Sequence, residues 1–179
     1  VIIPCPCWVS YPELVRINSG VPVFVHAAEA DGFVPKIEDL EKAITPRTKA
    51  IILNSPSNPC GYVMSGAALK GIADLAVAKD LFVISDEIYE MMVYEGERHI
   101  SIASFGPQIK ERTIVVNGLS KAYAMTGWRI GYTASSAAIA KAMGNLQSHV
   151  TSNPNSIAQH ASVAALNGPK DELFAMVKE

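Results

Sequence analysis

The sequence predicts an α/β fold, with a mostly parallel sheet that is covered by helices on both faces. Six short apolar runs have the length and composition of buried strands. Helical patterns alternate with these runs along much of the chain, which is typical of a parallel sheet with crossover helices. The 179 residues contain no internal repeat and no long linker, so one domain is the expected count.

The apolar runs and the helical patterns define the expected elements in order. We expect strands near residues 1–3, 21–25, 50–54, 81–85, 113–117 and 129–134. We expect helices near residues 10–18, 36–44, 66–79, 136–149, 154–167 and 170–179. Ser10 and Glu13 have the spacing of a capping box for the first helix, and Pro12 suits its first turn. The second helix has an apolar stripe at Ile37, Leu40 and Ile44.

The composition indicates which partners, membrane segments and metal sites are not expected for this protein. A net charge of −2 gives no reason to expect nucleic acid or an anionic membrane as a partner. No window approaches an uncharged apolar span of about twenty residues, so no transmembrane helix is expected. The cysteines of Cys5-Pro6-Cys7 have the wrong spacing for a zinc knuckle, and we expect no metal site. We interpret the cysteines as reduced thiols of a cytoplasmic protein.

Lys121 is the candidate nucleophile. It follows the strand-like run Thr113–Asn117, and a lysine at the carboxyl end of a buried strand can lose enough hydration to act as an amine nucleophile. Arg129 follows eight residues later, next to glycine-rich sequence, and a guanidinium fork of this kind holds phosphate. A surface lysine after an ordinary strand is the alternative interpretation.

Three further segments also place polar or aromatic residues just after a strand, where ligands bind in open α/β sheets. Asn58 follows the run 50–53, Asp86 and Tyr89 follow the run 81–85, and Trp8 follows the run 1–3. Each has an ordinary structural interpretation: Asn58-Pro-x-Gly as a turn, Asp86 as a helix cap, Tyr89 and Trp8 as packed aromatic residues.

Together and in this order, the four segments resemble the signatures of the class I and II aminotransferases of fold type I, in the aspartate-aminotransferase-like branch. The match includes Gly118 and Ser120 before the lysine, Gly127, and Arg129-Ile-Gly131. The resemblance implies the fold of the large domain that binds pyridoxal 5'-phosphate. It also implies an interior segment of that domain across residues 1–179, with the N-terminal segment and the C-terminal small domain outside the chain.

The resemblance assigns a role to each candidate residue. Lys121 would form the Schiff base with pyridoxal phosphate and carry the proton between substrate and cofactor, so it would be catalytic with Asp86 and Tyr89. Asp86 would keep the ring nitrogen protonated, and Tyr89 and Asn58 would bind the ring oxygen. Arg129 would hold the phosphate. Trp8 would stack on the ring, and Trp8 and Asn58 would also contact the substrate.

The resemblance further implies an enzyme that moves an amino group between an amino acid and a 2-oxo acid, and that acts as a homodimer when full length. The present segment alone is expected to be inactive. It also predicts cis peptide bonds at Cys5-Pro6 and Asn58-Pro59. Gly118 departs from the family, because many relatives have a phosphate-binding serine there. Two alternative functions on this fold stay open: a pyridoxal-phosphate-dependent carbon–sulfur lyase and a non-catalytic regulator module.

Overall fold

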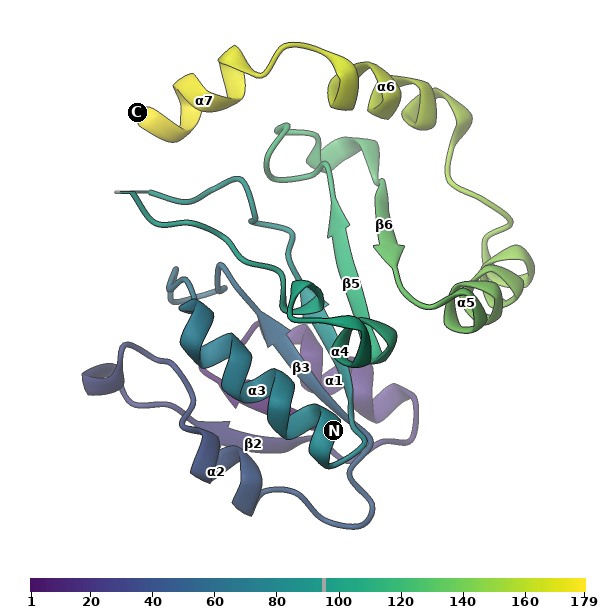
Figure 1. Cartoon of the computed structure of the whole chain (residues 1–179). Helices are drawn as coiled ribbons and strands as arrows, with labels where there is room; N and C mark the ends of the chain where they lie inside the picture. The colour runs from purple at the N-terminus through teal and green to yellow at the C-terminus, as the bar shows by residue number, and fades with distance from the viewer. Residues whose placement is uncertain (95) are drawn as a thin grey trace.

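The computed structural model describes residues 1–94 and 96–179. Within them, six strands form one sheet in the order β2-β1-β3-β4-β5-β6 (Figure 1). The strands are β1 (Ile2–Cys5), β2 (Val23–His26), β3 (Ala50–Asn54), β4 (Phe82–Asp86), β5 (Thr113–Gly118) and β6 (Gly131–Ala134). Neighbouring strands from β2 to β5 are parallel, and β6 runs antiparallel to β5. The predicted strands and the mostly parallel sheet are confirmed.

The helices correspond closely to the predicted patterns. They are α1 (Ser10–Ile17), α2 (Ile37–Lys42), α3 (Gly66–Ala78), α4 (Pro107–Arg112), α5 (Ala137–Val150), α6 (Ser156–Asn167) and α7 (Asp171–Lys178). Three short 3₁₀ turns, η1 (Glu29–Asp31), η2 (Ile102–Ser104) and η3 (Thr126–Trp128), complete the described elements. Helix α4 was not predicted, since its six residues are too short to show a clear apolar period.

The alternating side chains of the strands divide the core between the two faces of the sheet. In β3, Ile51 and Leu53 belong to the larger core, which includes residues of α2, α3 and α4. Ile52 points to the other face and packs with Tyr11 and Val15 of α1. This two-residue period is the geometry of a strand buried on both faces. Helices therefore cover both faces of the sheet, as predicted (Figure 1).

The predicted capping box at Ser10 is wrong. Ser10 is the first residue of α1, and the residue before it, Val9, has helical backbone angles and makes no side-chain cap bond. The backbone N–H of Tyr11 donates to the carbonyl of Trp8, so the chain is already turning before Ser10. An N-cap serine needs extended backbone angles, which this turn does not provide. Glu13 instead pairs with Arg16 on the surface.

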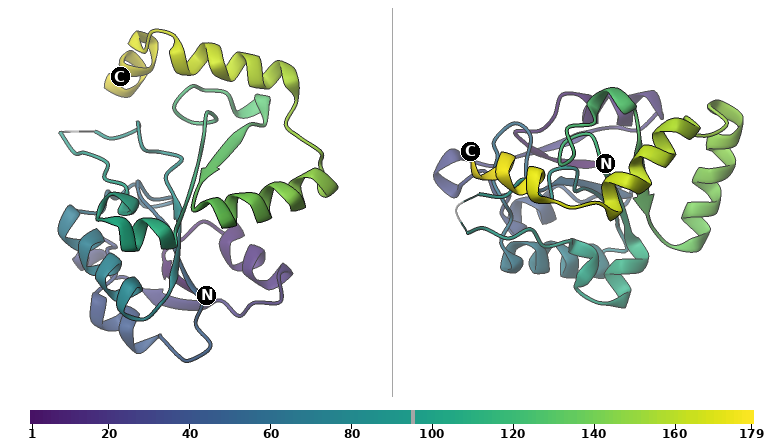
Figure 2. Two further views of the ribbon diagram at one scale, coloured as in Figure 1. Left: turned by 45° about the vertical axis from the view of Figure 1, so that its right-hand side comes forward. Right: turned by 90° about the horizontal axis from the view of Figure 1, so that it is seen from above.

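Helices α5 to α7 form an arm that leaves the end of β6 and extends past the carboxyl end of β5 (Figures 1 and 2). The arm exposes large apolar side chains, among them Leu146, Val150, Ile157, Val163 and Phe174. Helix α5 has no buried residue. An apolar surface of this kind marks an interaction site. Among the described residues, no helix has both the length and the hydropathy needed to cross a membrane.

Candidate active site

The carboxyl ends of four parallel strands meet at one edge of the sheet. Trp8 follows β1, Asn58 follows β3, Asp86 ends β4 and Lys121 follows β5. A cavity of about 350 Å³ lies at this edge. All six residues predicted from the sequence line it: Trp8, Asn58, Asp86, Tyr89, Lys121 and Arg129. The strand order thus brings together residues that are up to 121 positions apart in the sequence.

Asp86 is held by two donors. The phenol of Tyr11 donates a hydrogen bond of 2.7 Å to Oδ2, and the backbone N–H of Ile88 donates one of 3.1 Å to Oδ1. Burial and the neighbouring Asp86 charge raise the pKa of Tyr11 far above its ordinary value, so the phenol keeps its proton and stays a donor. An ionised carboxylate accepts several hydrogen bonds, so Asp86 can accept another from a ligand.

Asn54 joins the loop of Asn58 to the end of β4. Its side-chain amide donates to the carbonyl of Asp86 at 3.0 Å, and its side-chain oxygen accepts from the backbone N–H of Asn58 at 2.7 Å. Asn54 is buried and pairs directly with Asp86 across the sheet. Neither Asn54 nor Tyr11 was predicted from the sequence as a site residue. The Trp8-x-x-Tyr11 spacing was the only local signal for the latter.

The peptide bonds preceding two prolines of the site loops agree with the sequence expectation. Cys5-Pro6 and Asn58-Pro59 are both cis. Ser55-Pro56 is also cis and was not predicted.

Lys121 lies beside Tyr89 in the cavity. The Lys121 Nζ atom is 5.8 Å from the centre of the Tyr89 ring, within the range of a cation–π contact. Both side chains are half-buried. Both residues line the same cavity as Asp86.

Gly118 has a packing reason for lacking a side chain. A Cβ atom at this position would meet the Cα of Gly131 and the carbonyl oxygen of Ile130 at 3.0 Å each. These are backbone atoms of β6 and of the residue before it, so they cannot move aside as a flexible side chain would. A serine at position 118 would thus require β6 to shift. Ser120 does line the cavity.

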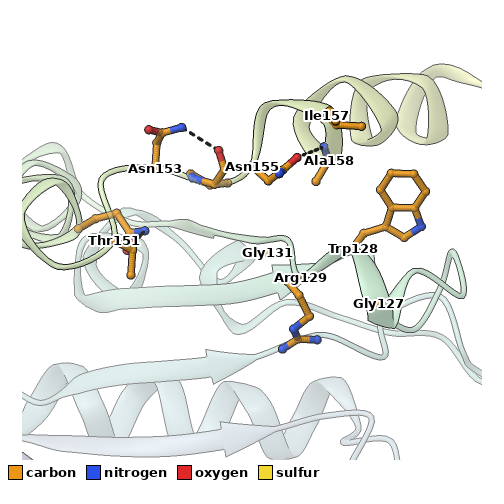
Figure 3. A pocket seen from close by; sticks show the side chains of 11 residues that line it. Gly127, Trp128, Arg129, Gly131, Thr151, Asn153, Asn155, Ile157 and Ala158 are labelled. Carbon is orange, nitrogen blue, oxygen red and sulfur yellow. Dashed lines mark hydrogen bonds between the residues drawn. The ribbon is translucent and has the colours of Figure 1, made fainter.

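Arg129 connects the cavity to a larger hollow. The arginine has left-handed backbone angles (φ 51°) and is exposed, and its Nη1 donates to the carbonyl of Thr126 at 2.7 Å. The hollow, of about 870 Å³, lies between the β6 segment and the start of α6. Figure 3 shows the Arg129 guanidinium pointing away from Asn153 and Asn155 on the arm. Asp86, Tyr89 and Lys121 line the smaller cavity and do not line the hollow, so the smaller cavity is the candidate active site.

Glu87 is buried beside the site and was not identified from the sequence. Only 3% of its surface is exposed. Its carboxylate accepts hydrogen bonds from Ser85 at 2.9 Å and Ser101 at 2.8 Å, and it lies 3.1 Å from Nε2 of His99. Burial raises the pKa of Glu87, but the hydrogen bonds from His99, Ser101 and Ser85 outweigh it and lower the pKa below its ordinary value. This network joins the residue after Asp86 to the segment that contains His99 and Ser101.

Comparisons with known proteins show the family to which the chain belongs. The family model "Aminotransferase class I and II" matches residues 1–179. The chain is 51% identical over 176 residues to an aspartate aminotransferase of Geobacillus stearothermophilus, covering 98% of the chain and 45% of that relative.

Solved structures of aminotransferases are also similar to the chain. The aspartate aminotransferase of Rhizobium meliloti matches with a TM-score of 0.96 and 46% identity, over 99% of the chain and 44% of that protein. The aromatic aminotransferase of Pyrococcus horikoshii matches with a TM-score of 0.93 and 42% identity, over 99% of the chain and 47% of that protein. The chain thus spans less than half the length of the relatives it matches.

Proposed function

The chain belongs to the class I and II aminotransferase family, and on this premise we propose that the whole protein is a pyridoxal-phosphate-dependent aminotransferase of the aspartate-aminotransferase type. It moves an amino group between an amino acid and a 2-oxo acid. The observation that carries the proposal is the convergence of Lys121, Asp86 and Arg129 in one cavity. No observation favours a carbon–sulfur lyase or a regulator module.

The side chains that line the cavity fit pyridoxal phosphate. They supply an amine, a carboxylate, a phenol, a guanidinium group and an indole face, at Lys121, Asp86, Tyr89, Arg129 and Trp8 respectively. A guanidinium group can bind phosphate through two parallel hydrogen bonds. An indole face offers a flat apolar surface for an aromatic ring. The cavity volume of about 350 Å³ is that of a small-molecule site.

Bound pyridoxal phosphate supplies an electron-withdrawing ring that makes the substrate Cα–H acidic. In the proposed mechanism, the Lys121 amine would take up that proton and give it back, as general base and then general acid. Asp86 would pair with the ring nitrogen, and Tyr11 keeps the Asp86 carboxylate in place. Tyr89 and Asn58 would be hydrogen-bond donors to the cofactor.

The domain organisation, the oligomeric state and the location of the whole protein are also proposals. We propose that residues 1–179 are an interior segment of the large domain, and that the whole protein is a homodimer. The exposed apolar side chains of α5–α7 support this, because further protein must cover them in a stable subunit. Twofold dimers are also the commonest oligomers. A cytoplasmic location is supported by the three free cysteines.

The decisive experiment uses the whole protein with pyridoxal phosphate. Borohydride reduction followed by peptide mapping should place the pyridoxyl group on Lys121. A panel of amino donors, including aspartate and aromatic amino acids, with 2-oxoglutarate as acceptor should show transamination, with aspartate preferred. Label on another lysine would overturn the assignment of Lys121, and a protein that eliminates thiol from cysteine conjugates without transaminating would be a lyase.

A further inference from the structure

Two thiols are in contact at the end of β1, where the chain turns towards the cavity. The Sγ atoms of Cys5 and Cys7 are 3.7 Å apart. Their separation of two residues keeps the Cα atoms within about 7 Å, which overlaps the range of about 4.4–6.8 Å that disulfides span. The sulfur atoms would have to approach from 3.7 Å to about 2.05 Å for a bond to form. Both cysteines are half-buried, so a small oxidant can reach them.

We propose that Cys5 and Cys7 form a reversible disulfide that controls the position of Trp8, with a low-molecular-weight disulfide such as oxidised glutathione as the oxidant. The Cys7 thiolate attacks one sulfur of the oxidant, forms a mixed disulfide and releases one glutathione thiolate. The Cys5 sulfur then attacks the Cys7 sulfur and releases the second. The two protons of the protein thiols end on the two glutathione molecules, and the two cysteines are oxidised while the glutathione disulfide is reduced.

The surroundings of the two thiols give them different roles. The Cys5 thiol donates to the Cys7 sulfur and also approaches the carbonyl of Ile3 at 3.6 Å. Burial, followed by the hydrogen bond and the charge of Cys7, raises the pKa of Cys5 to about 12. Cys5 therefore keeps its proton while Cys7 is a free thiol. Since the thiolate is the attacking species, Cys5 is the poorer first nucleophile, and Cys7 reacts first. Once Cys7 is in the mixed disulfide, its hydrogen bond and charge no longer hold the Cys5 proton, so Cys5 can lose that proton and close the ring.

The disulfide would act on the site through Trp8, which is bonded directly to Cys7. The Trp8 ring packs edge-on against Tyr11, with centroids 5.5 Å apart and an interplanar angle of 85°. Tyr11 in turn donates to Asp86. Cys7 also packs against the apolar cluster that includes Tyr11 and Ile52. Drawing the Cys7 sulfur towards Cys5 removes it from this cluster and turns the backbone that carries Trp8.

The effect on activity rests on the proposed function. A misplacement of about 1 Å in a catalytic site can lower the rate about 10²-fold. We therefore expect oxidation to lower transamination at least about tenfold, and reduction to restore it. The ring is short, so it gives little stabilisation of the folded chain, and a bond of that kind is easily reduced. These are the properties of a switch and not of a structural brace.

The test treats the whole protein with oxidised glutathione, alkylates the remaining thiols and maps the peptides. We expect a Cys5–Cys7 disulfide that dithiothreitol removes, in the wild type and equally in Cys60→Ser. Cys5→Ser should instead retain a glutathione adduct on Cys7, because nothing closes the ring. In a Trp128→Phe background, oxidation should change the emission of Trp8, and this change should be absent in Cys7→Ser.

Each readout can overturn a stated part of the proposal. The proposal that a disulfide forms would be refuted if Cys5 and Cys7 each carried glutathione and were not joined to one another. It would also be refuted if neither thiol were lost. Unchanged Trp8 emission after the disulfide forms would overturn its control of the site. Mapping and emission do not depend on catalysis. If the peptide map and the Trp8 emission are as expected while neither redox form transaminates, the proposed function is wrong and the proposed disulfide is still supported. A tenfold loss of transamination in the wild type, absent in Cys7→Ser, supports both.

Discussion

The Tyr11→Phe substitution isolates the hydrogen bond that holds Asp86. Phenylalanine keeps the ring of Tyr11, which is 6% exposed, so no cavity opens. The change removes one O–H donor 2.7 Å from a carboxylate oxygen, a length typical of charge-assisted bonds. A hydrogen bond to a charged group contributes about 1.5–3 kcal/mol. The free energy of unfolding should fall by about this amount at pH 7.

Urea unfolding of the whole protein without cofactor measures this loss. Tyr132→Phe is the matched control, because the Tyr132 side chain is 46% exposed and its substitution should stay within about 0.5 kcal/mol of the wild type. Tyr11→Phe should also bind pyridoxal phosphate about tenfold more weakly. Without the hydrogen bond that orients Asp86, the binding free energy should be less favourable by about 1.4 kcal/mol, which corresponds to a factor of ten. A Tyr11→Phe protein that matches Tyr132→Phe in both stability and cofactor affinity would refute the role of Tyr11 in holding Asp86.

Four further predictions follow from the site and the surface. Lys121→Ala should abolish transamination while near-UV circular dichroism stays that of the wild type; residual turnover above background would exclude Lys121 as the proton carrier. Asp86→Ala should lower the rate by about 10³-fold or more, because a charged hydrogen bond in a closed site is lost, and near-normal turnover would assign that role elsewhere. Because the pKa of Glu87 is lowered in the folded chain, its carboxylate stabilises the fold above pH 4.5 and loses this effect as the pH falls below 4.5. Urea titrations at pH 7 and pH 4 should therefore show a smaller loss of unfolding free energy on acidification for Glu87→Gln than for the wild type. Equal losses would contradict the stabilising role of the Glu87 hydrogen-bond network. Sedimentation of the whole protein should give a dimer, and a fully active monomer would refute the proposed homodimer.

Several features of this protein could be predicted from the sequence because they depend on neighbours along the chain. The run Ala50–Leu53 is apolar at every position, so it is identified as a buried strand without knowledge of its partners. The residues that follow each strand could be proposed as site residues, because the ends of parallel strands meet at one edge. Capping was harder to predict. Ser10 fits the capping pattern, but the turn from Trp8 to Tyr11 begins the helix earlier.

Local sequence patterns were sufficient to predict the α/β class, the strands, every helix except α4, and six of the residues that line the cavity, because apolar period and turn chemistry are local properties. The groups that hold those six residues in place could not be predicted, because they come from distant parts of the chain. The Tyr11–Asp86 bond joins positions 75 apart, and the Asn54 bridge to Asp86 joins positions 32 apart. The antiparallel pairing of β6 decided that Gly118 has no room for a side chain. Strand order and register set these contacts, and both follow from packing across the whole sheet, which no local pattern of residues encodes.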